Sequence, residues 1–348
     1  MTTGKRVAFA AIAVLLSFGI LLTATVAADM YAHHRVEQSA GVNVWGYRGP
    51  KIRRQQPGEH RLFVIGGSTV FGYGVTWDRA FPAQLAVALQ GLSKDRAPVS
   101  VVNLGYNNQG AYAFRYGLMD YERFGYDAVI FYEGYNDLGD VPNDYIGRRD
   151  SPVFRLTGYF PVLPLVMLEK AKAIRSGGNI EAAYWGKTVF RPNLASRATA
   201  DTLEAAAHIG AGLDDQLGRF AKASRVNGTG VIPRVTNVGC SLPWRFYCGA
   251  VYDGIRYALD HGKRVLVVTQ PYFSESHRAQ QAELRVMLGS RFGGNPAVRY
   301  VDFGDLIDLV HSPLSDDRMH LTGEGNALVA RSLVAPVVAL MPEAFENR

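Results

Sequence analysis

The sequence predicts an α/β fold with a doubly wound, mostly parallel five-stranded sheet. One observation is a set of short apolar runs typical of strands buried on both faces, namely residues 62–65, 101–103, 128–132, 265–269 and 298–302. Another is the helical spacing of apolar residues in the intervening stretches, namely residues 81–92, 111–124, 203–223, 251–259, 278–292 and 323–340. Because crossovers between parallel strands are right-handed, this alternation predicts helices on both faces and ligand sites at the carboxyl ends of the strands.

Composition narrows the class of protein. The chain has 348 residues, of which 48% are hydrophobic, so it can bury one large core and is neither disordered nor a disulfide-dense miniprotein. The formal charge is +6, but the basic residues are scattered and form no arginine-rich helix. We therefore expect no nucleic-acid partner.

The N-terminal segment is apolar enough to enter a membrane. Lys5 and Arg6 precede an uncharged stretch from Val7 to Ala28, about the 20 residues that a bilayer-spanning helix needs. We expect residues 1–28 to form a transmembrane anchor. A cleaved signal segment is the alternative, since small residues precede Asp29. The charge bias places the N-terminus inside and the body of the chain outside the cytoplasm, in the periplasm of a bacterium.

Two further segments complete the predicted organisation. Residues 29–60 are polar and irregular, which predicts a linker before a domain over residues 61–341. An insertion over residues 140–249 separates the third strand from the fourth. Its apolar segment at 160–168 is too short and too proline-broken to span a bilayer, and it is either a lid, a membrane-facing patch or a cap on the core.

The cysteines bear on the compartment. Cys240 and Cys248 flank a Pro243-Trp244 turn, and their spacing can close a small loop in an oxidising compartment. Two buried free thiols are the alternative. No CxxC pair or histidine cluster indicates zinc, and we expect neither a metal nor an organic cofactor.

A candidate nucleophile follows the first predicted strand, which ends in Gly66-Gly67-Ser68-Thr69. Small neighbours leave the Ser68 hydroxyl open, although glycine-serine turns are common structural features. The GxSxG elbow is absent because Val70 occupies its second glycine position. A dinucleotide-binding motif also fails, since Trp77 stands where its third glycine belongs.

A candidate base lies near the C-terminus, in the loop before the last predicted helix. Asp317 and His320 stand three positions apart, so the carboxylate can orient the imidazole. This loop follows the fifth strand and should therefore meet Ser68 at the same edge of the sheet.

Acyl transfer also requires hydrogen-bond donors for an oxyanion. Asn103-Leu104-Gly105 follows the second strand, and Gly105 would let its backbone N–H approach a ligand closely. Gly134-Tyr135-Asn136-Asp137 follows the third strand, and Asn136 offers a side-chain amide. Each cluster alone could be an ordinary loop. Polar clusters at successive strand ends, each fitting a different part of one mechanism, favour a common site.

The order GGST, NLG, GYND and DRMH resembles the four blocks of the SGNH or GDSL-like hydrolase superfamily, over residues 61–139 and 262–341. The resemblance implies the flavodoxin-like SGNH hydrolase fold, with Ser68 as nucleophile, His320 as base and Asp317 as its partner. It also implies three oxyanion donors: the Ser68 N–H, the Gly105 N–H and the Asn136 side chain. One departure is Gly67, where many members carry an aspartate, and such GGS variants are similar to membrane-associated, polysaccharide-linked branches.

We therefore expect a serine esterase or deacylase that cleaves ester-linked acyl groups, with O-acetyl groups of an extracytoplasmic polysaccharide as the leading substrate. The same residues could instead transfer an acyl group to a glycan hydroxyl. A catalytically idle scaffold of an envelope polysaccharide assembly complex is the remaining alternative. The expected partners are an acylated glycan or other ester substrate and, through the N-terminal helix, a membrane.

Overall fold

A computed structural model describes residues 3–39, 41–139, 141–175, 177, 194–207, 235–315 and 317–345. The chain divides into two compact units. The smaller unit comprises Met1–Ser39 and Ser151–Val226, and the larger one comprises Ala40–Asp150 and Asn227–Arg348. Only part of the predicted insertion therefore belongs to the smaller unit, because the chain rejoins the larger unit at Asn227.

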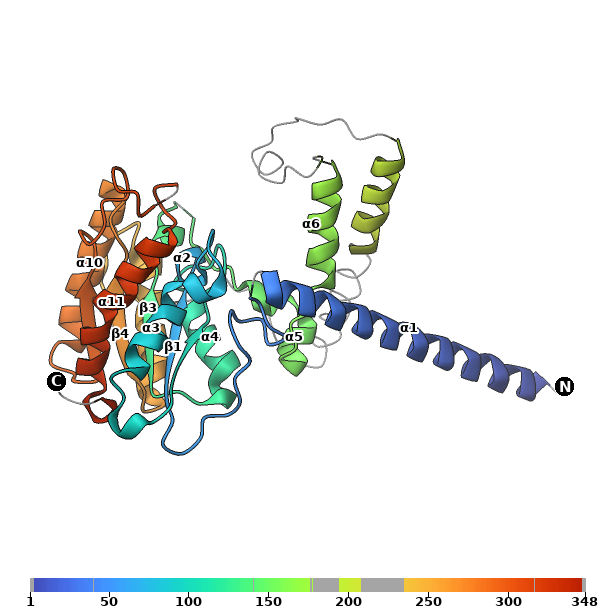
Figure 1. The fold of residues 1–348 in the computed structure, drawn as a ribbon, viewed down its shortest axis with the longest axis horizontal. Helices are drawn as coiled ribbons and strands as arrows, with labels where there is room; N and C mark the ends of the chain where they lie inside the picture. Colours follow the sequence, from blue (N-terminus) through green and yellow to red (C-terminus); the bar gives the residue numbers. More distant parts are fainter. Residues whose placement is uncertain are drawn as a thin grey trace. The chain divides into compact units, whose positions relative to one another are not determined.

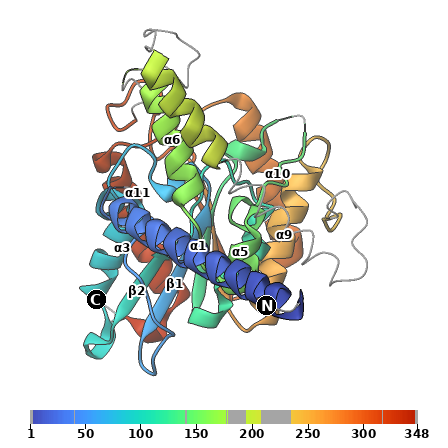
Figure 2. The same cartoon turned by 90° about the vertical axis from the view of Figure 1, so that its right-hand side faces the viewer.

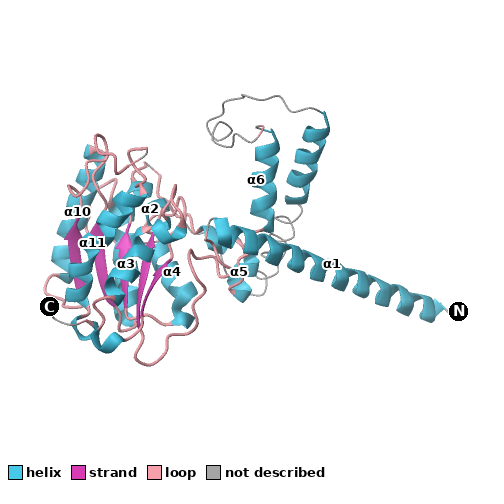
Figure 3. Ribbon diagram, in the orientation of Figure 1, coloured by secondary structure: helices cyan, strands magenta, loops and turns pink. Residues whose placement is uncertain are grey.

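The larger unit confirms the predicted α/β fold. Its five strands are parallel and lie in the order β2-β1-β3-β4-β5, the order expected of a doubly wound sheet (Figure 3). The strands are β1 His60–Gly66, β2 Val99–Asn103, β3 Ala128–Tyr132, β4 Arg264–Thr269 and β5 Val298–Asp302. Each begins and ends within two residues of its predicted run. In β1, β3 and β4, nearly continuous burial of both faces leaves a clear apolar pattern.

Helices cover both faces of this sheet (Figure 1). The helices are α2 Ser68–Phe71, α3 Phe81–Gln90, α4 Ala113–Tyr121, α9 Arg245–Asp260, α10 Glu275–Phe292 and α11 Gly323–Leu340. Short 3-10 turns include η3 Glu122–Phe124, η4 Tyr135–Asp137 and η5 Gly147–Asp150. Helix α11 packs beside α3, and α4 packs beside α9.

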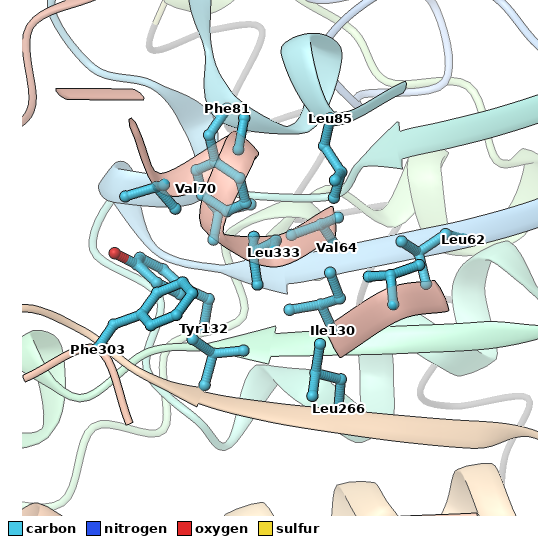
Figure 4. Packing of buried hydrophobic residues seen from close by; sticks show 14 of the residues in the cluster. Leu62, Val64, Val70, Phe81, Leu85, Ile130, Tyr132, Leu266, Phe303 and Leu333 are labelled. Carbon is cyan, nitrogen blue, oxygen red and sulfur yellow. The ribbon is translucent and has the colours of Figure 1, made fainter. Parts of the chain in front are cut away.

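Alternate side chains of the central strands enter different layers of the core, as the two-residue period of a strand requires. Leu62 and Val64 join the cluster that contains Phe81 of α3 and Leu333 of α11 (Figure 4). On β3, Phe131 stacks on Phe114 of α4 with 4.3 Å between ring centroids. Burial of both faces fixes the strand register, and with it the positions of the loops at the carboxyl edge.

Residues 41–59, predicted as part of a linker, instead pack onto the larger unit. Tyr47 and Arg48 are buried, and the Arg48 N–H donates to the Asn103 carbonyl over 3.1 Å. The Arg48 guanidinium donates to the carbonyls of Phe71, Gly72 and Val75, the chain that follows α2. The polar sequence of this segment suggested an exposed linker. An arginine can nevertheless be buried when its N–H groups donate to backbone carbonyls inside the fold.

The smaller unit contains α1 Thr3–Ser39, α5 Pro152–Thr157, α6 Leu163–Arg175 and a helix over residues 194–207. The predicted helix 203–223 is described only through residue 207, and the rest lies outside the described residues. Figures 1 and 2 show α1 as one continuous helix. It passes residue 28 without a break, so residues 29–39 are helical and not irregular as predicted.

Polar contacts explain why α1 continues. The buried Asp29 carboxylate accepts from the N–H groups of Val162, over 2.9 Å, and Leu163, over 2.6 Å, at the start of α6. His33 Nε2 lies 2.6 Å from the Phe160 carbonyl. The predicted apolar segment 160–168 thus packs its first residues against α1, within this unit. Thr3–Glu37 is, among the described residues, a helix long and apolar enough to cross a membrane.

Candidate active site

Ser68 begins α2 directly after the glycine pair that ends β1. Close approach of the neighbouring strand requires Gly66, since a Cβ there would lie 2.1 Å from the Tyr132 carbonyl oxygen. A Cβ on Gly67 would lie 2.3 Å from Asn136 Nδ2, so that side chain would have to move. Ser68 is half-buried. As the first residue of a helix, it has an N–H without a partner inside that helix.

The loop before α11 brings a histidine and an aspartate to Ser68. His320 Nε2 lies 2.8 Å from Ser68 Oγ, and His320 Nδ1 lies 2.6 Å from Asp317 Oδ2. The second oxygen, Asp317 Oδ1, accepts from the N–H groups of Met319 and His320, over 3.0 and 2.7 Å. One carboxylate therefore orients the imidazole and also shapes the turn that carries it.

The carboxyl of Asp317 is suited to remain ionised. Partial burial opposes its ionisation, but hydrogen bonds from the His320 backbone and side chain outweigh the burial, so its pKa lies below the usual value. The bonding pattern implies that the neutral imidazole carries its proton on Nδ1, which leaves Nε2 free to accept the Ser68 proton.

Asn136 lies in the turn η4, and its side-chain nitrogen is beside Gly67. Its side-chain nitrogen donates to the Gln109 carbonyl over 3.0 Å and, more weakly, to Glu133 Oε1 over 3.3 Å. Both amide hydrogens thus have partners in the resting site. The longer of the two bonds is the one that an incoming acceptor could replace at least cost.

Gly105 approaches the nucleophile turn closely, since a Cβ there would lie 2.3 Å from Phe71 N. Its N–H donates to Asn103 Oδ1 over 3.0 Å. The buried guanidinium of Arg148 donates to the carbonyls of Leu104, over 3.1 Å, and Gly105, over 2.9 Å. Donation from Gly105 to a ligand would therefore require the bond to Asn103 to be exchanged, while Arg148 keeps the loop in place.

Three functional neighbours were not predicted from the sequence: Tyr73, Glu133 and Arg148. The Tyr73 ring lies 4.7 Å from the His320 ring between centroids and is half exposed. Glu133 is buried at the end of β3, and burial raises the pKa of its carboxyl to about 7 despite several hydrogen bonds. Glu133 and Tyr73 do stand beside predicted motifs, but adjacency alone does not indicate where a side chain points.

A cavity of about 350 Å³ lies against the Asn136 loop. Its lining combines residues that follow β3 with residues before and at the start of α9, including Asp137, Gly139, Leu242, Pro243 and Arg245. The side chain of Arg245 is exposed and has no partner within the described part of the chain. Cys240 and Cys248 form a disulfide that closes the segment containing these last three residues.

No cluster of three or more histidine, cysteine, aspartate or glutamate side chains that could hold a metal ion occurs among the described residues.

Comparisons with known proteins gave structural matches alone. No protein-family model and no curated protein sequence matches the chain. Among solved structures, a member of the lipolytic protein G-D-S-L family from Veillonella parvula has a TM-score of 0.41 at 9% identity, with 79% of this chain and 97% of that one covered. Axe2, an acetylxylan esterase from Geobacillus stearothermophilus, has a TM-score of 0.40 at 13% identity, with 83% and 96% covered. A family 3 carbohydrate esterase from Clostridium thermocellum has a TM-score of 0.41 at 9% identity, with 82% and 99% covered.

Proposed function

We propose that the chain is a membrane-anchored serine esterase of the SGNH type that removes O-acetyl groups from an extracytoplasmic polysaccharide. The observation that carries this proposal is the hydrogen-bonded series from Ser68 Oγ through His320 to Asp317, at the carboxyl edge of the sheet. A hydroxyl, an imidazole and a carboxylate in this order are the parts that nucleophilic acyl transfer needs.

The chemistry follows from these distances. His320 Nε2 takes the Ser68 proton as Oγ attacks the ester carbonyl, and Asp317 stabilises the imidazolium that forms. Collapse of the tetrahedral intermediate breaks the bond to the alcohol oxygen, which receives the proton from His320. Water then attacks the acyl carbonyl and gives a proton to His320. Collapse of the second intermediate breaks the bond to Ser68 Oγ, which takes that proton from His320 as the acid leaves.

The oxyanion of each intermediate needs donors. We assign this role to the Ser68 N–H, the Asn136 side chain and the Gly105 N–H. In the resting site Asn136 donates to Glu133 over a long 3.3 Å contact, and Gly105 donates to Asn103. Binding of the substrate would replace these bonds with bonds to its carbonyl oxygen. The new bonds become stronger as that oxygen turns into an oxyanion.

The substrate class rests on the surroundings of the site. The cavity beside the Asn136 loop is the place we assign to the sugar, since its volume of about 350 Å³ falls in the range of small-molecule sites. Arg245 adds a cationic, hydrogen-bonding group to its lining. The apolar helix α1 supports attachment to a membrane surface. The family resemblance of the four motifs agrees with acyl esters as substrates.

The experiment that tests the function combines a fluorophosphonate probe with product analysis on acetylated glycans, short p-nitrophenyl esters and phospholipids. We expect Ser68-dependent labelling and release of acetate from the glycans. Acyl transfer to an added glycan in place of acetate release would indicate the transferase. If the wild-type chain neither reacts with the probe nor turns over any ester, the esterase hypothesis is wrong and the scaffold hypothesis remains.

A further inference from the structure

Glu133 occupies an unusual place for a carboxylate. It directly follows β3 and is only 3% exposed, and the hydrogen bonds of its carboxylate go to the loops around Ser68 and Asn136. Oε2 accepts from the Gly67 N–H over 2.5 Å. Oε1 accepts from the N–H groups of Gly134, over 2.9 Å, and Asn136, over 3.0 Å, and contacts Asn136 Nδ2 over 3.3 Å.

We propose that Glu133 is the positioning residue of this site, whose carboxylate holds the turn before Ser68 and the loop of Asn136 in a fixed relation. This inference rests on the proposed esterase function and adds to it a residue that touches neither the substrate nor the nucleophile. Each oxygen serves a different segment: Oε2 holds the residue before the nucleophile, and Oε1 holds the loop that carries the amide donor.

The glycine before Ser68 and the carboxylate of Glu133 are complementary in space. A Cβ on residue 67 would lie 2.4 Å from Glu133 Oε2 and 2.3 Å from Asn136 Nδ2, closer than carbon atoms approach such groups. Gly67 has a φ of −85°, so its conformation does not itself require glycine. The space is instead taken by the carboxylate, which reaches the Gly67 N–H from β3.

The donors around Glu133 are backbone and side-chain N–H groups. Neither lysine nor arginine contacts its carboxylate among the described residues, and the neighbouring acidic group is Asp137, whose pKa burial raises well above its usual value. Nothing in this arrangement is an ion pair. The bonds to N–H groups therefore determine where Glu133 lies, and Glu133 in turn determines where those N–H groups lie.

A simpler role for Glu133 is to cap the turn η4 after β3. Glutamine separates the two roles, because its carbonyl oxygen can accept from Gly134 and Asn136 while its amide group cannot accept from Gly67. A capping role would leave turnover unchanged in Glu133→Gln. The positioning role predicts a loss of kcat with KM unchanged, because the donors are misplaced only for the transition state.

We expect Glu133→Gln to lower kcat for ester hydrolysis by up to about 100-fold, the scale of an ångström misplacement in a site. Glu59→Gln is the matched control, since this carboxylate lies at the opposite, amino end of β1 and bonds to Ser100 over 2.9 Å. It should retain wild-type kcat. If Glu133→Gln does not fold by circular dichroism, Glu133→Asp keeps the charge, withdraws the oxygens by one methylene and should show the same loss.

A double-variant cycle with Asn136→Ala tests whether the effect passes through the amide donor. If Glu133 acts by fixing Asn136 relative to the turn before Ser68, the double variant of Glu133→Gln and Asn136→Ala should lose little more kcat than Asn136→Ala alone, because no amide donor is left to misplace. Multiplication of the two losses, or wild-type kcat in the folded Glu133 variants, would overturn the inference. The proposed function fails separately, by undiminished ester turnover in Ser68→Ala.

Discussion

At the residue scale, Ser68 meets His320, 252 positions away in the sequence, and His320 meets the nearby Asp317, through two short hydrogen bonds. If Ser68 is the nucleophile, Ser68→Ala and His320→Ala should each lower kcat on the order of 10⁶-fold, and Asp317→Ala about 10⁴-fold. The milder effect of Asp317 follows because an imidazole can act without its orienting carboxylate, though less often in the productive tautomer. Measurement of kcat on a p-nitrophenyl ester gives the relative losses of the three variants, and circular dichroism confirms that each is folded. Equal turnover in Ser68→Ala and the wild type would contradict it.

Asn136 allows a sharper comparison between two substitutions. Loss of one oxyanion donor costs about 10²- to 10³-fold in kcat, so Asn136→Ala should turn over slowly with KM nearly unchanged. Asn136→Asp should be at least as poor, because its carboxylate would face both the oxyanion and Glu133. A residue that merely caps the turn would tolerate aspartate, and preserved kcat in Asn136→Asp would identify it as such.

The pKa of Glu133 predicts a pH effect on stability. Burial raises this pKa from 4.5 to about 7, so between these pH values the folded protein binds more protons than the unfolded chain. Its contribution to the free energy of unfolding is therefore greatest below about pH 4.5 and falls by at most about 3 kcal/mol as the pH rises through 7. Glu133→Gln lacks this ionisation. Denaturant unfolding of both proteins from pH 5 to 8 should show wild-type stability falling relative to the variant, and parallel curves would contradict the assignment.

The site residues that the sequence predicts differ from those it does not predict in how their positions are determined. Ser68, His320 and Asn136 follow apolar runs whose burial fixes the strand ends, so their common edge could be inferred from pattern alone. Glu133 stands between a strand and a predicted motif, and nothing in the sequence says that it turns inward. Gly67 was visible in the sequence as a departure from the SGNH pattern that the motifs resemble. Its explanation, a carboxylate supplied from the neighbouring strand, needed the packing.

At the scale of elements, the strands and most helices followed from apolar periodicity, while the polar segments did not. Residues 41–59 and the part of α1 beyond residue 28 are polar, and their sequence predicted irregular structure. Their polar side chains have partners inside the fold: Arg48 donates to backbone carbonyls, and Asp29 accepts hydrogen bonds from N–H groups at the start of α6. Periodicity records burial of apolar surface. It carries no information on a buried polar group satisfied by a distant backbone.

The disulfide gives a prediction about one loop. Cys240 and Cys248 enclose Leu242 and Pro243, which line the cavity beside Asn136. Cys240→Ser with Cys248→Ser should lower the free energy of unfolding by about 2 to 3 kcal/mol, the value expected for a short loop. If the cavity binds the sugar, KM for an acetylated glycan should rise while KM for a p-nitrophenyl ester should not. Thermal melting and the two KM values test this, and equal changes for both substrates would remove the sugar from this cavity.

At the scale of the whole molecule, the apolar helix α1 is either kept as a membrane anchor or removed as a signal segment. Helix α1 runs from the apolar stretch into residues that pack within the smaller unit, and its chain shows no break near Ala28. Large apolar side chains such as Val14, Leu15 and Ile20 are exposed along it. Such a surface is unfavourable in water and favourable in the hydrocarbon core of a bilayer. From this continuity we predict a retained anchor, although a signal segment has the same length and composition.

We therefore expect the full chain to sediment with membranes and to resist carbonate extraction, with protease added from outside the cytoplasm able to reach the catalytic unit. The control is Ala28→Leu, which replaces the small residue that a signal peptidase would require before Asp29. With a retained anchor, both chains keep the same mass and the same distribution between membrane and soluble fractions. A wild-type protein that begins at Asp29 and is soluble, beside an Ala28→Leu protein that stays full-length and membrane-bound, would show that the segment is a signal.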